Sequence, residues 1–296
     1  MQSSEYVGVI VPTHNRRTTL LRCLESVRQM VDIPSLVVVV FDGCTDGSQQ
    51  AVRDHFPDVL CVEGDGNLWW SGAINAGIRA AEARGASHFF LLNDDVLPDP
   101  MALASLMEVS RQQPAAIIGS QILALENRDQ IWCVGGGAQW SGRGIYMLGN
   151  GQRYQPGSHE VKAVDWLPGM GTLIPGAAIA ATGGMDTRHF PQYFGDTDFS
   201  MRARKKGFPV LVCPKSLLFN ETSITGVVLK PGPVSLRRAR DLLFSRRSHA
   251  NIPTRLRFWL RHCPPLWIPW QVTRFYLPIF ASLFKKILVD GPPVEE

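Results

Sequence analysis

The fold is decided by one stretch of the sequence, Phe89-Phe90-Leu91-Leu92-Asn93-Asp94-Asp95-Val96. Its apolar run ends in an amide and two carboxylates before Leu97-Pro98, which indicates a buried parallel strand ending at the carboxyl edge of a sheet. Open α/β sheets bind ligands at that edge. Adjacent acids repel each other there unless a divalent cation neutralises them, and Mg²⁺ or Mn²⁺ suits oxygen ligands. By itself the motif fits equally well an Asx turn that caps a helix beginning near Met101.

Composition describes an ordinary globular protein. The chain has 296 residues, 45% hydrophobic and 19% charged, which is enough for a sizeable core. Its six cysteines form no CxxC pair, so neither a zinc site nor a disulfide framework is indicated, and they suit a reducing compartment. The first apolar run, Val7 to Val11, is broken by Pro12 and is too short for a signal peptide. We therefore expect a cytoplasmic protein.

Two earlier strands precede the central one. Val7 to Val11 and Leu36 to Phe41 are apolar and rich in β-branched residues, and Thr18 to Met30 has helical spacing between them. Strand, helix and strand begin a βαβ sheet. Asp42, at the end of the second strand, can accept a hydrogen bond from a ribose hydroxyl or a base N–H, or can simply form a turn in its Gly-rich loop.

Four segments in order then carry a resemblance: VIVPTHNR (Val9 to Arg16), VVVFDGCTDGS (Val38 to Ser48), GNLWWSGAINAGI (Gly66 to Ile78) and LLNDDV (Leu91 to Val96). Together they resemble the inverting family 2 glycosyltransferases of the GT-A fold, particularly bacterial enzymes, including rhamnosyltransferases, that build surface polysaccharide. The resemblance implies an α/β fold with a mostly parallel, Rossmann-like central sheet flanked by helices. We expect residues 1–225 to form the catalytic domain and residues 226–296 a helical appendage.

The resemblance also assigns roles to single residues. It implies a divalent metal, Mg²⁺ or Mn²⁺, bound directly by Asp95 in the "DXD" position, while Asp94 contacts ribose or orients the site. The nucleotide-sugar-binding residues that it implies are Pro12, Thr13, Asn15, Arg16, Asp42, Asn67, Gly72, Asn75, Asn93 and Asp94. Phe41 stands where many members have another acid, and Trp69 stands where related sequences often place Gly, so the donor is left open.

A second group of acids lies at Phe194-Gly195-Asp196-Thr197-Asp198, at the start of a predicted helix that stops at Gly207. Carboxylates there cap free N–H groups, and we expect that role for Asp198. For Asp196 the resemblance implies the general base, which takes the proton of the acceptor hydroxyl on the face opposite the departing phosphate. Gly195 replaces the acid usual in the family.

The implied function is transfer of a sugar from a nucleotide-diphosphate sugar to a hydroxyl of a saccharide or lipid-linked saccharide, a precursor of cell-surface polysaccharide. No Gln-x-x-Arg-Trp motif is present, which favours a single addition over polymer synthesis. Relatives commonly have a His near Asn220 that can face the metal or the diphosphate. In this chain either Asn220 or Glu221 takes its place, or that function is lost. Two alternatives remain. A sugar nucleotidyltransferase would have a Gly-rich basic loop at residues 12–15, where this chain has Pro-Thr-His-Asn. A non-catalytic nucleotide-sugar-binding subunit would explain why Phe41, Gly195 and Asn220 replace the residues usual in the family.

The C-terminal segment differs from the rest in charge. Residues 1–228 carry a net −4, whereas residues 229–296 carry a net +8 and many aromatic side chains. Prolines break its apolar stretches, and none approaches the ~20 residues that span a bilayer. Such helices lie in a membrane interface, here the inner face of the cell membrane, or pack as a lid whose arginines grip the donor diphosphate. A nucleic-acid partner suits the charge but not the motifs upstream.

Overall fold

The computed structural model describes residues 5–31, 33–157, 160–221 and 235–288. The chain forms two compact units. The first comprises Met1–Gly137, Tyr146–Pro191 and Gly195–Ser223, and the second comprises Ala138–Ile145, Gln192–Phe194 and Ile224–Glu296. The predicted domain boundary between residues 225 and 226 lies outside the described residues and stays a prediction.

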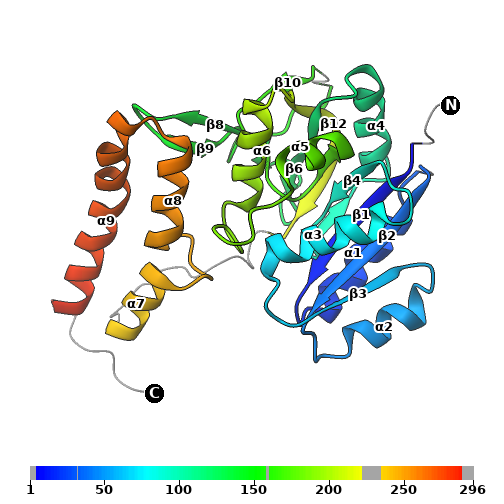
Figure 1. Cartoon of the computed structure of the whole chain (residues 1–296), viewed down its shortest axis with the longest axis horizontal. Coiled ribbons are helices and arrows are strands. Elements are labelled where there is room, and N and C mark those ends of the chain that lie inside the picture. The colour runs from blue at the N-terminus through cyan, green and yellow to red at the C-terminus, as the bar shows by residue number, and fades with distance from the viewer. Residues whose placement is uncertain (1–4, 32, 158–159, 222–234, 289–296) are drawn as a thin grey trace. The chain divides into compact units, whose positions relative to one another are not determined.

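A ten-stranded sheet forms the centre of the first unit (Figure 1). Its strands run in the order β10-β12-β6-β11-β4-β1-β2-β3, with β5 beside β12 and β7 beside β6. Strands β1 to β4 are mutually parallel where they pair, and β11 is antiparallel to β4 and β6. The expected α/β fold with a mostly parallel sheet is confirmed. The strands are β1 (Val7–Thr13), β2 (Ser35–Asp42), β3 (Leu60–Gly64), β4 (His88–Leu91), β5 (Val96–Pro98), β6 (Ile117–Ala124), β7 (Ile131–Cys133), β10 (Lys162–Ala163), β11 (Thr172–Pro175) and β12 (Val210–Asn220). Strands β8 (Gly136–Gln139) and β9 (Gly144–Met147) pair separately.

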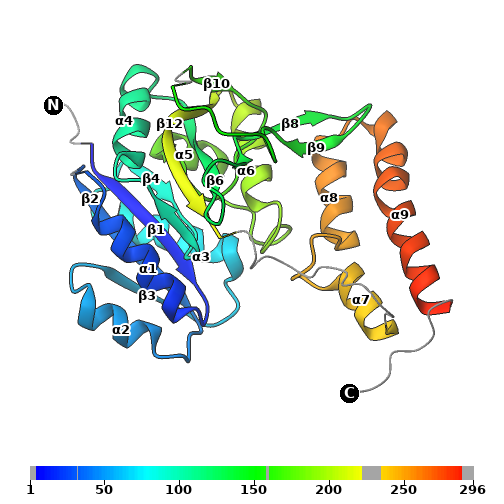
Figure 2. The same ribbon diagram turned by 180° about the vertical axis from the view of Figure 1, so that it is seen from behind.

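Helices cover both faces of the sheet, which explains why its central strands are apolar without interruption. Helices α1 (Arg17–Arg28), α2 (Ser48–His55) and α4 (Ala102–Gln112) contribute to one core layer (Figure 2). Helices α3 (Trp69–Glu82), α5 (Gly176–Thr182) and α6 (Gly195–Lys205) contribute to the other. Side chains of a strand alternate between faces, so Val9 and Val11 enter the first layer and Ile10 the second.

The segment expected to be one strand through Val96 is divided in two. Strand β4 ends at Leu91, and β5 begins at Val96 and pairs with β12 instead. The polar residues between them form the turn, so the two carboxylates lie where the chain leaves one strand position for another. This break places Asp94 and Asp95 at the carboxyl edge of β4, in the middle of the sheet.

The second unit is helical and contains α7 (Leu236–Phe244), α8 (Ile252–His262), a 3₁₀ turn (Pro265–Trp267) and α9 (Ile268–Leu288). Asn251 begins α8 by accepting a hydrogen bond from the Thr254 N–H at 2.9 Å. Arg255 is buried within this unit, its guanidinium 3.5 Å from the ring centroid of Phe275 and 4.9 Å from that of Phe194. None of the helices in the described ranges is long and apolar enough to cross a membrane.

Gly77 provides a test of how closely α3 packs on the sheet. A Cβ on Gly77 would lie 2.4 Å from Ile10 Cγ2, inside a buried central strand. Although alanine favours a helix by up to about 1 kcal/mol, overpacking of a core costs about 1–3 kcal/mol. We expect Gly77→Ala to lower the free energy of unfolding, as measured by urea denaturation. The exposed Glu82→Ala on the same helix should change it by less than about 0.5 kcal/mol, and equal stability of the two variants would contradict this packing.

Candidate active site

The acidic turn after β4 is tied to the loop after β1. Thr13 Oγ1 donates a hydrogen bond to Asp94 Oδ2 at 2.8 Å. The Arg16 guanidinium pairs with Asp94 Oδ1 at 2.8 Å and with Asp95 Oδ2 at 3.0 Å. Burial raises the pKa of Asp94 to about 6, with Arg16 opposing the rise and the neighbouring Asp95 adding to it. Four predicted site residues therefore form one charged cluster.

Two buried oxygens in this region accept no hydrogen bond from the described residues: Asp95 Oδ1 and Asn220 Oδ1. Strand β12 brings Asn220 there, because it pairs with Val96 of β5 and the next N–H, of Glu221, lies 3.4 Å from the Asp95 carbonyl oxygen. Glu221 itself forms an ion pair with Arg22. Within the described ranges no three His, Cys, Asp or Glu side chains gather to hold a metal. The residues present fit Mg²⁺ or Mn²⁺, which bind proteins through one or two carboxylates together with water and substrate phosphates.

Asp42 is engaged with the backbone that precedes α3. Its Oδ1 accepts from the N–H groups of Gly66 at 2.8 Å and Leu68 at 3.2 Å, and its Oδ2 accepts from Trp69 at 2.9 Å. Trp69 has a left-handed backbone with φ of 55°. The usual glycine of related sequences suits this conformation, which costs a bulky residue about 1–3 kcal/mol. The carboxylate of Asp42 thus shapes a strained loop.

The other predicted nucleotide-binding residues differ in their surroundings. Asn15 also has a left-handed backbone, with φ of 53°, and its Oδ1 accepts from the Thr45 N–H at 2.7 Å. Asn75 clamps α3 to Met185, whose N–H and carbonyl it contacts at 2.9 Å each. Asn67 is exposed, Gly72 is buried against Leu68, and Pro12 is half-buried in β1. The structure therefore brings Asn15 to the same loop region as Arg16, while Asn75 faces the protein.

Trp70 links the acidic turn to the predicted base. Its Nε1–H donates to Asn93 Oδ1 at 3.0 Å. The six-membered ring of its indole lies against Gly169, where a Cβ would be 2.1 Å from Cζ2. The N–H of Gly169 donates to Asp196 Oδ2 at 2.8 Å. One indole ring therefore connects the residue beside Asp94 to the residue that binds Asp196, and all of these residues belong to the first unit.

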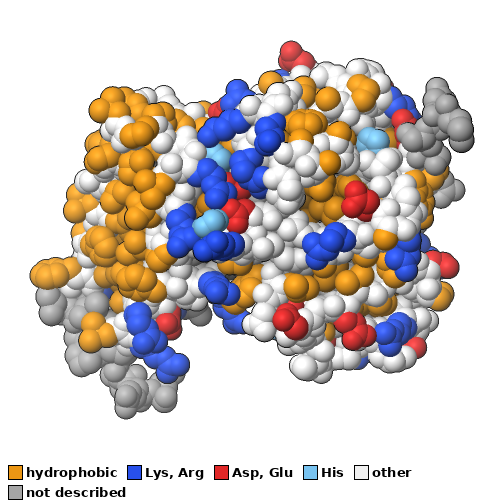
Figure 3. Space-filling view, in the orientation of Figure 1, with side chains coloured by type: hydrophobic (Ala, Val, Ile, Leu, Met, Phe, Trp, Pro, Cys, Tyr) orange, Lys and Arg blue, Asp and Glu red, His pale blue; other side chains and the backbone are white. Residues whose placement is uncertain are grey.

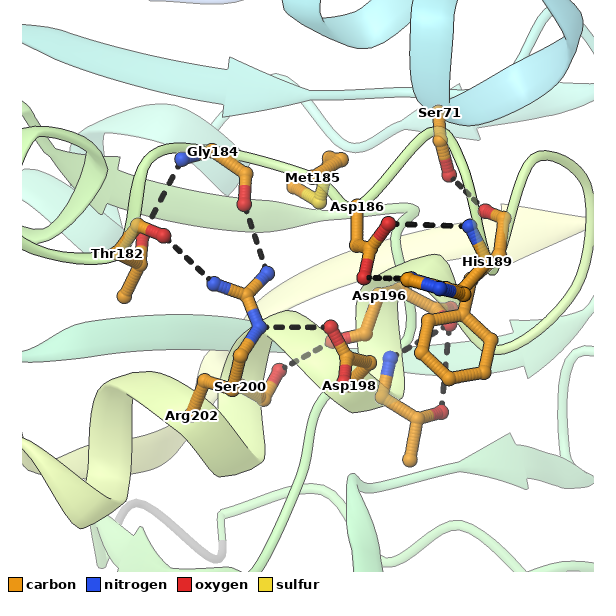
Figure 4. Close-up of polar contacts among 12 residues, drawn as sticks. Ser71, Thr182, Gly184, Met185, Asp186, His189, Asp196, Asp198, Ser200 and Arg202 are labelled. Atoms are coloured by element: carbon orange, nitrogen blue, oxygen red, sulfur yellow. Dashed lines mark hydrogen bonds and ion pairs between the residues drawn. The ribbon is translucent and has the colours of Figure 1, made fainter. Parts of the chain in front are cut away.

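Asp196 lies at the start of α6 and is partly buried (Figure 4). Its Oδ1 accepts from the Thr197 N–H at 2.7 Å. Burial raises the pKa of this carboxyl, and the N–H donors of Thr197 and Gly169 oppose the rise. A carboxylate with a raised pKa, held in place by backbone donors, is chemically suited to accept a proton.

Asp198, in contrast, has a structural partner. Its fully buried carboxylate pairs with Arg202 Nε at 2.7 Å. Arg202 also donates to the carbonyl oxygens of Thr182 at 2.8 Å and Gly184 at 2.7 Å (Figure 4). The pair fastens α6 to the turn after α5.

Position 195 has no room for a side chain. A Cβ on Gly195 would lie 2.2 Å from Ser71 Oγ and 3.1 Å from the Phe190 carbonyl oxygen. Ser71 binds that segment firmly, since its Oγ donates to the Phe190 carbonyl at 2.5 Å and its N–H to the Pro191 carbonyl at 2.9 Å. Where the predicted motif has its second acid, this structure has Ser71 of α3 in the space that a side chain would need.

Sequence reasoning missed Ser71, Trp70 and Gly169 as parts of the site. The only signal was the Pro168-Gly169-Met170-Gly171 turn before a strand, since glycines in such a turn indicate close approach of another group.

With this geometry in view, comparison with known proteins defines the class. The fold resembles that of glycosyltransferases of known structure. S. aureus TarS (residues 1–349) aligns with a TM-score of 0.54 at 14% identity, over 73% of this chain and 60% of that one. GalNAc-T7, solved with UDP, GalNAc and Mn²⁺, aligns with a TM-score of 0.61 at 13% identity, over 96% of this chain and 59% of that one. The chain thus spans about 60% of each of these solved chains.

The family model for glycosyl transferase family 2 matches residues 8–161, more than half of the chain. The chain belongs to this family and is a glycosyltransferase. It is 24% identical over 245 residues to the N-acetylglucosaminyl-diphospho-decaprenol L-rhamnosyltransferase of Mycobacterium tuberculosis, in strains CDC 1551 and H37Rv. That match covers 75% of this chain and 78% of the relative. The resemblance in the sequence motifs is confirmed.

The contact between Gly195 and Ser71 generates a second prediction. Gly195→Ala should lower the free energy of unfolding by about 1–3 kcal/mol because its Cβ meets Ser71 Oγ. Ser71→Ala removes that oxygen and leaves the Ser71 Cβ at 3.5 Å, an ordinary contact. The double variant should therefore lose less free energy of unfolding than the sum of the losses of the two single variants. A double-mutant cycle of urea unfolding measures this difference. Strict additivity would show that the two residues do not meet.

Proposed function

We propose that this glycosyltransferase transfers a sugar from a nucleotide-diphosphate sugar to an acceptor hydroxyl with inversion, by direct displacement with Asp196 as base. The observation that supports this most is that one indole ring, that of Trp70, contacts both Asn93, which precedes Asp94, and Gly169, whose N–H binds Asp196. A base on one side and a centre for the leaving diphosphate on the other are what a one-step displacement needs.

In this mechanism Asp196 accepts the proton of the acceptor hydroxyl as that oxygen attacks the anomeric carbon. Backbone donors from Gly169 and Thr197 hold the carboxylate in place. Arg16 and Thr13 hold the side chains of Asp94 and Asp95 in register. A divalent metal, for which we propose Asp95 as the direct ligand with the Asn220 oxygen nearby, would neutralise the charge that develops on the departing diphosphate.

The donor site is proposed to lie along the ends of β1 and β4, with Pro12, Thr13, Asn15, Arg16, Asn67, Gly72, Asn93 and Asp94 around it. Asp42 and Asn75 contribute by fixing backbone, since their side chains already bind main-chain groups. The acceptor is proposed to be a lipid-linked saccharide, a precursor of cell-surface polysaccharide. The name of the mycobacterial relative supports this class of acceptor, and GalNAc-T7 with UDP and Mn²⁺ supports the nucleotide and metal.

The role of Asp196 is tested by Asp196→Asn, which keeps the size of the side chain but removes the base. We expect kcat to fall by about 10²–10⁴-fold, while the dissociation constant of the donor in calorimetry stays within about twofold. The pKa of Asp196 is raised above the ordinary aspartate value of about 3.9. In the wild type, kcat/KM should therefore fall as the pH drops through this raised pKa, because a protonated Asp196 cannot accept the proton of the acceptor hydroxyl. This acid limb should be absent from the residual activity of the variant.

Nucleoside-diphosphate release from a panel of UDP-, dTDP- and GDP-sugars, with Mn²⁺ and a prenyl-linked acceptor, provides the assay. Asp198→Asn serves as a comparison, since its effect should be on unfolding rather than on the pH profile. Full turnover by Asp196→Asn would refute the assigned base. Binding of donors without turnover by the wild type would favour a nucleotide-sugar-binding subunit instead.

We further propose that the second unit contacts the inner face of the cell membrane. Of the twelve large hydrophobic side chains exposed in the described ranges, nine lie in α7 to α9 and the 3₁₀ turn, and these side chains cover α8 and α9 in Figure 3. Trp270, Leu277 and Phe284 recur every seven residues and so lie along one side of α9. Leu260 of α8 is exposed as well, and we call these four side chains the apolar surface of the second unit.

Charge indicates which partner suits this surface. Between Asp241 and Asp290 the sequence has eight Lys and Arg and no acid. A second copy of the same surface would bring these like charges together, whereas anionic lipid headgroups attract each one by about 1 kcal/mol. Amphipathic helices with basic and aromatic residues insert in this way without spanning the bilayer. This interaction would bring the enzyme to a lipid-linked acceptor.

Membrane contact is tested by sedimentation of the full chain with vesicles. We expect binding to phosphatidylglycerol vesicles that exceeds binding to phosphatidylcholine vesicles and decreases with added salt. Leu260→Gln and Leu277→Gln should each lower the partition coefficient about tenfold, because each removes an inserted side chain worth about 1.5–3 kcal/mol. Met101→Gln, an exposed apolar residue of the first unit, is the matched control. Unchanged partitioning of both leucine variants would contradict this surface.

A further inference from the structure

We propose that Trp70 is a positioning residue that holds the segment of Asp196 at a fixed separation from the acidic turn of β4. The proposal rests on the proposed role of Asp196 and adds the element that sets its place. The indole contacts both sides of the site. Its Nε1–H donates to Asn93 Oδ1 at 3.0 Å, and the adjoining edge of the six-membered ring, at Cε2, Cζ2 and Cη2, lies against the backbone of Gly169.

The second contact requires a glycine. A Cβ on Gly169 would lie 2.1 Å from Trp70 Cζ2 and 2.4 Å from Cη2, which is within the ring itself. Gly169 is buried, and its N–H is the group that binds Asp196 Oδ2 at 2.8 Å. If the indole moves, the Gly169 peptide loses the side chain that packs against it, and this peptide holds the Asp196 carboxylate.

The backbone on both sides of Trp70 is fixed, so the indole cannot follow a displaced neighbour. The N–H of Trp69 donates to Asp42 Oδ2 at 2.9 Å, and the N–H of Ser71 donates to the Pro191 carbonyl at 2.9 Å. The left-handed backbone of Trp69 sets the direction in which the chain enters α3. Trp70 is thus a rigid spacer. Its backbone belongs to α3, and its ring contacts the segments that contain Asn93 and Gly169.

This arrangement gives Trp70 an effect that general loss of packing would not produce. The Gly169 N–H favours the ionised form of Asp196. If the ring is lost, the Gly169 peptide can shift and its hydrogen bond weakens, so the pKa of Asp196 should rise further. A loss of one such bond corresponds to about 0.5–1 pKa unit.

Two variants separate the contacts. Trp70→Leu removes the donor to Asn93 and most of the ring that supports Gly169. Trp70→Phe removes the donor and the outer ring atoms Cζ2 and Cη2, but keeps a shorter aromatic ring on the same side. We expect the Leu variant to raise the pKa of Asp196 by about 0.5–1 unit and to lower kcat/KM by about 10–100-fold, since misplacement by about 1 Å costs that much. The Phe variant should raise the pKa of Asp196 by less than the Leu variant and lose less activity.

The pKa is read directly, by titrating protein labelled with ¹³C at the aspartate carboxyl carbon. The Asp196 signal is identified by its loss in Asp196→Asn. Trp132→Leu, at a half-buried tryptophan of the first unit, controls for the removal of an indole and should leave this titration unchanged. The proposal is overturned if Asp196 titrates identically in the wild type and Trp70→Leu, or if Trp132→Leu shifts it equally. Because this titration does not require turnover, failure of the assigned base would appear separately, as full activity of Asp196→Asn.

Discussion

The site depends on the carboxylate of Asp42, which accepts three backbone N–H groups from the loop before α3. These bonds hold the left-handed residue Trp69 and thereby the direction of the first turn of the helix. From that turn Trp70 reaches Asn93 and Gly169, and Ser71 binds the segment that leads into α6. A buried carboxylate that accepts several charge-assisted bonds is well suited to stabilise such strain.

The two sides of the site are built differently. On one side, side chains meet side chains: Thr13 and Arg16 bind the paired acids, and burial raises the pKa of Asp94 to about 6. On the other side, Asp196 is held by backbone N–H groups. Backbone donors do not change their charge when a proton moves, whereas the charge of the side-chain cluster depends on the ionisation of its carboxyl groups. This difference is consistent with the roles that we propose for the two sides.

The sequence predicted the sheet and the acidic turn because both depend on local patterns. Apolar strands that end in polar residues indicate buried strands and the edge where they end. The break between β4 and β5 was not predicted, since only the pairing of β5 with β12 reveals that the chain has moved to another strand position. For Asp42 the sequence left open a ligand contact or a turn, and no local pattern shows that its carboxylate accepts three N–H groups of the loop before α3. The contacts of Trp70 with Gly169 and of Ser71 with Gly195 join distant segments, so they depend on tertiary structure alone.

The crowding at Gly195 has a consequence for the family as a whole. The hydroxyl of Ser71 lies 2.2 Å from where a Cβ at position 195 would be, so a side chain at position 195 is disfavoured while that hydroxyl is present. Members that retain an acid immediately before the base should therefore have a smaller residue at the position of Ser71. The residues at the positions of Ser71 and Gly195 should therefore covary across homologues. Their identities would indicate whether a member uses one carboxylate or two at this place.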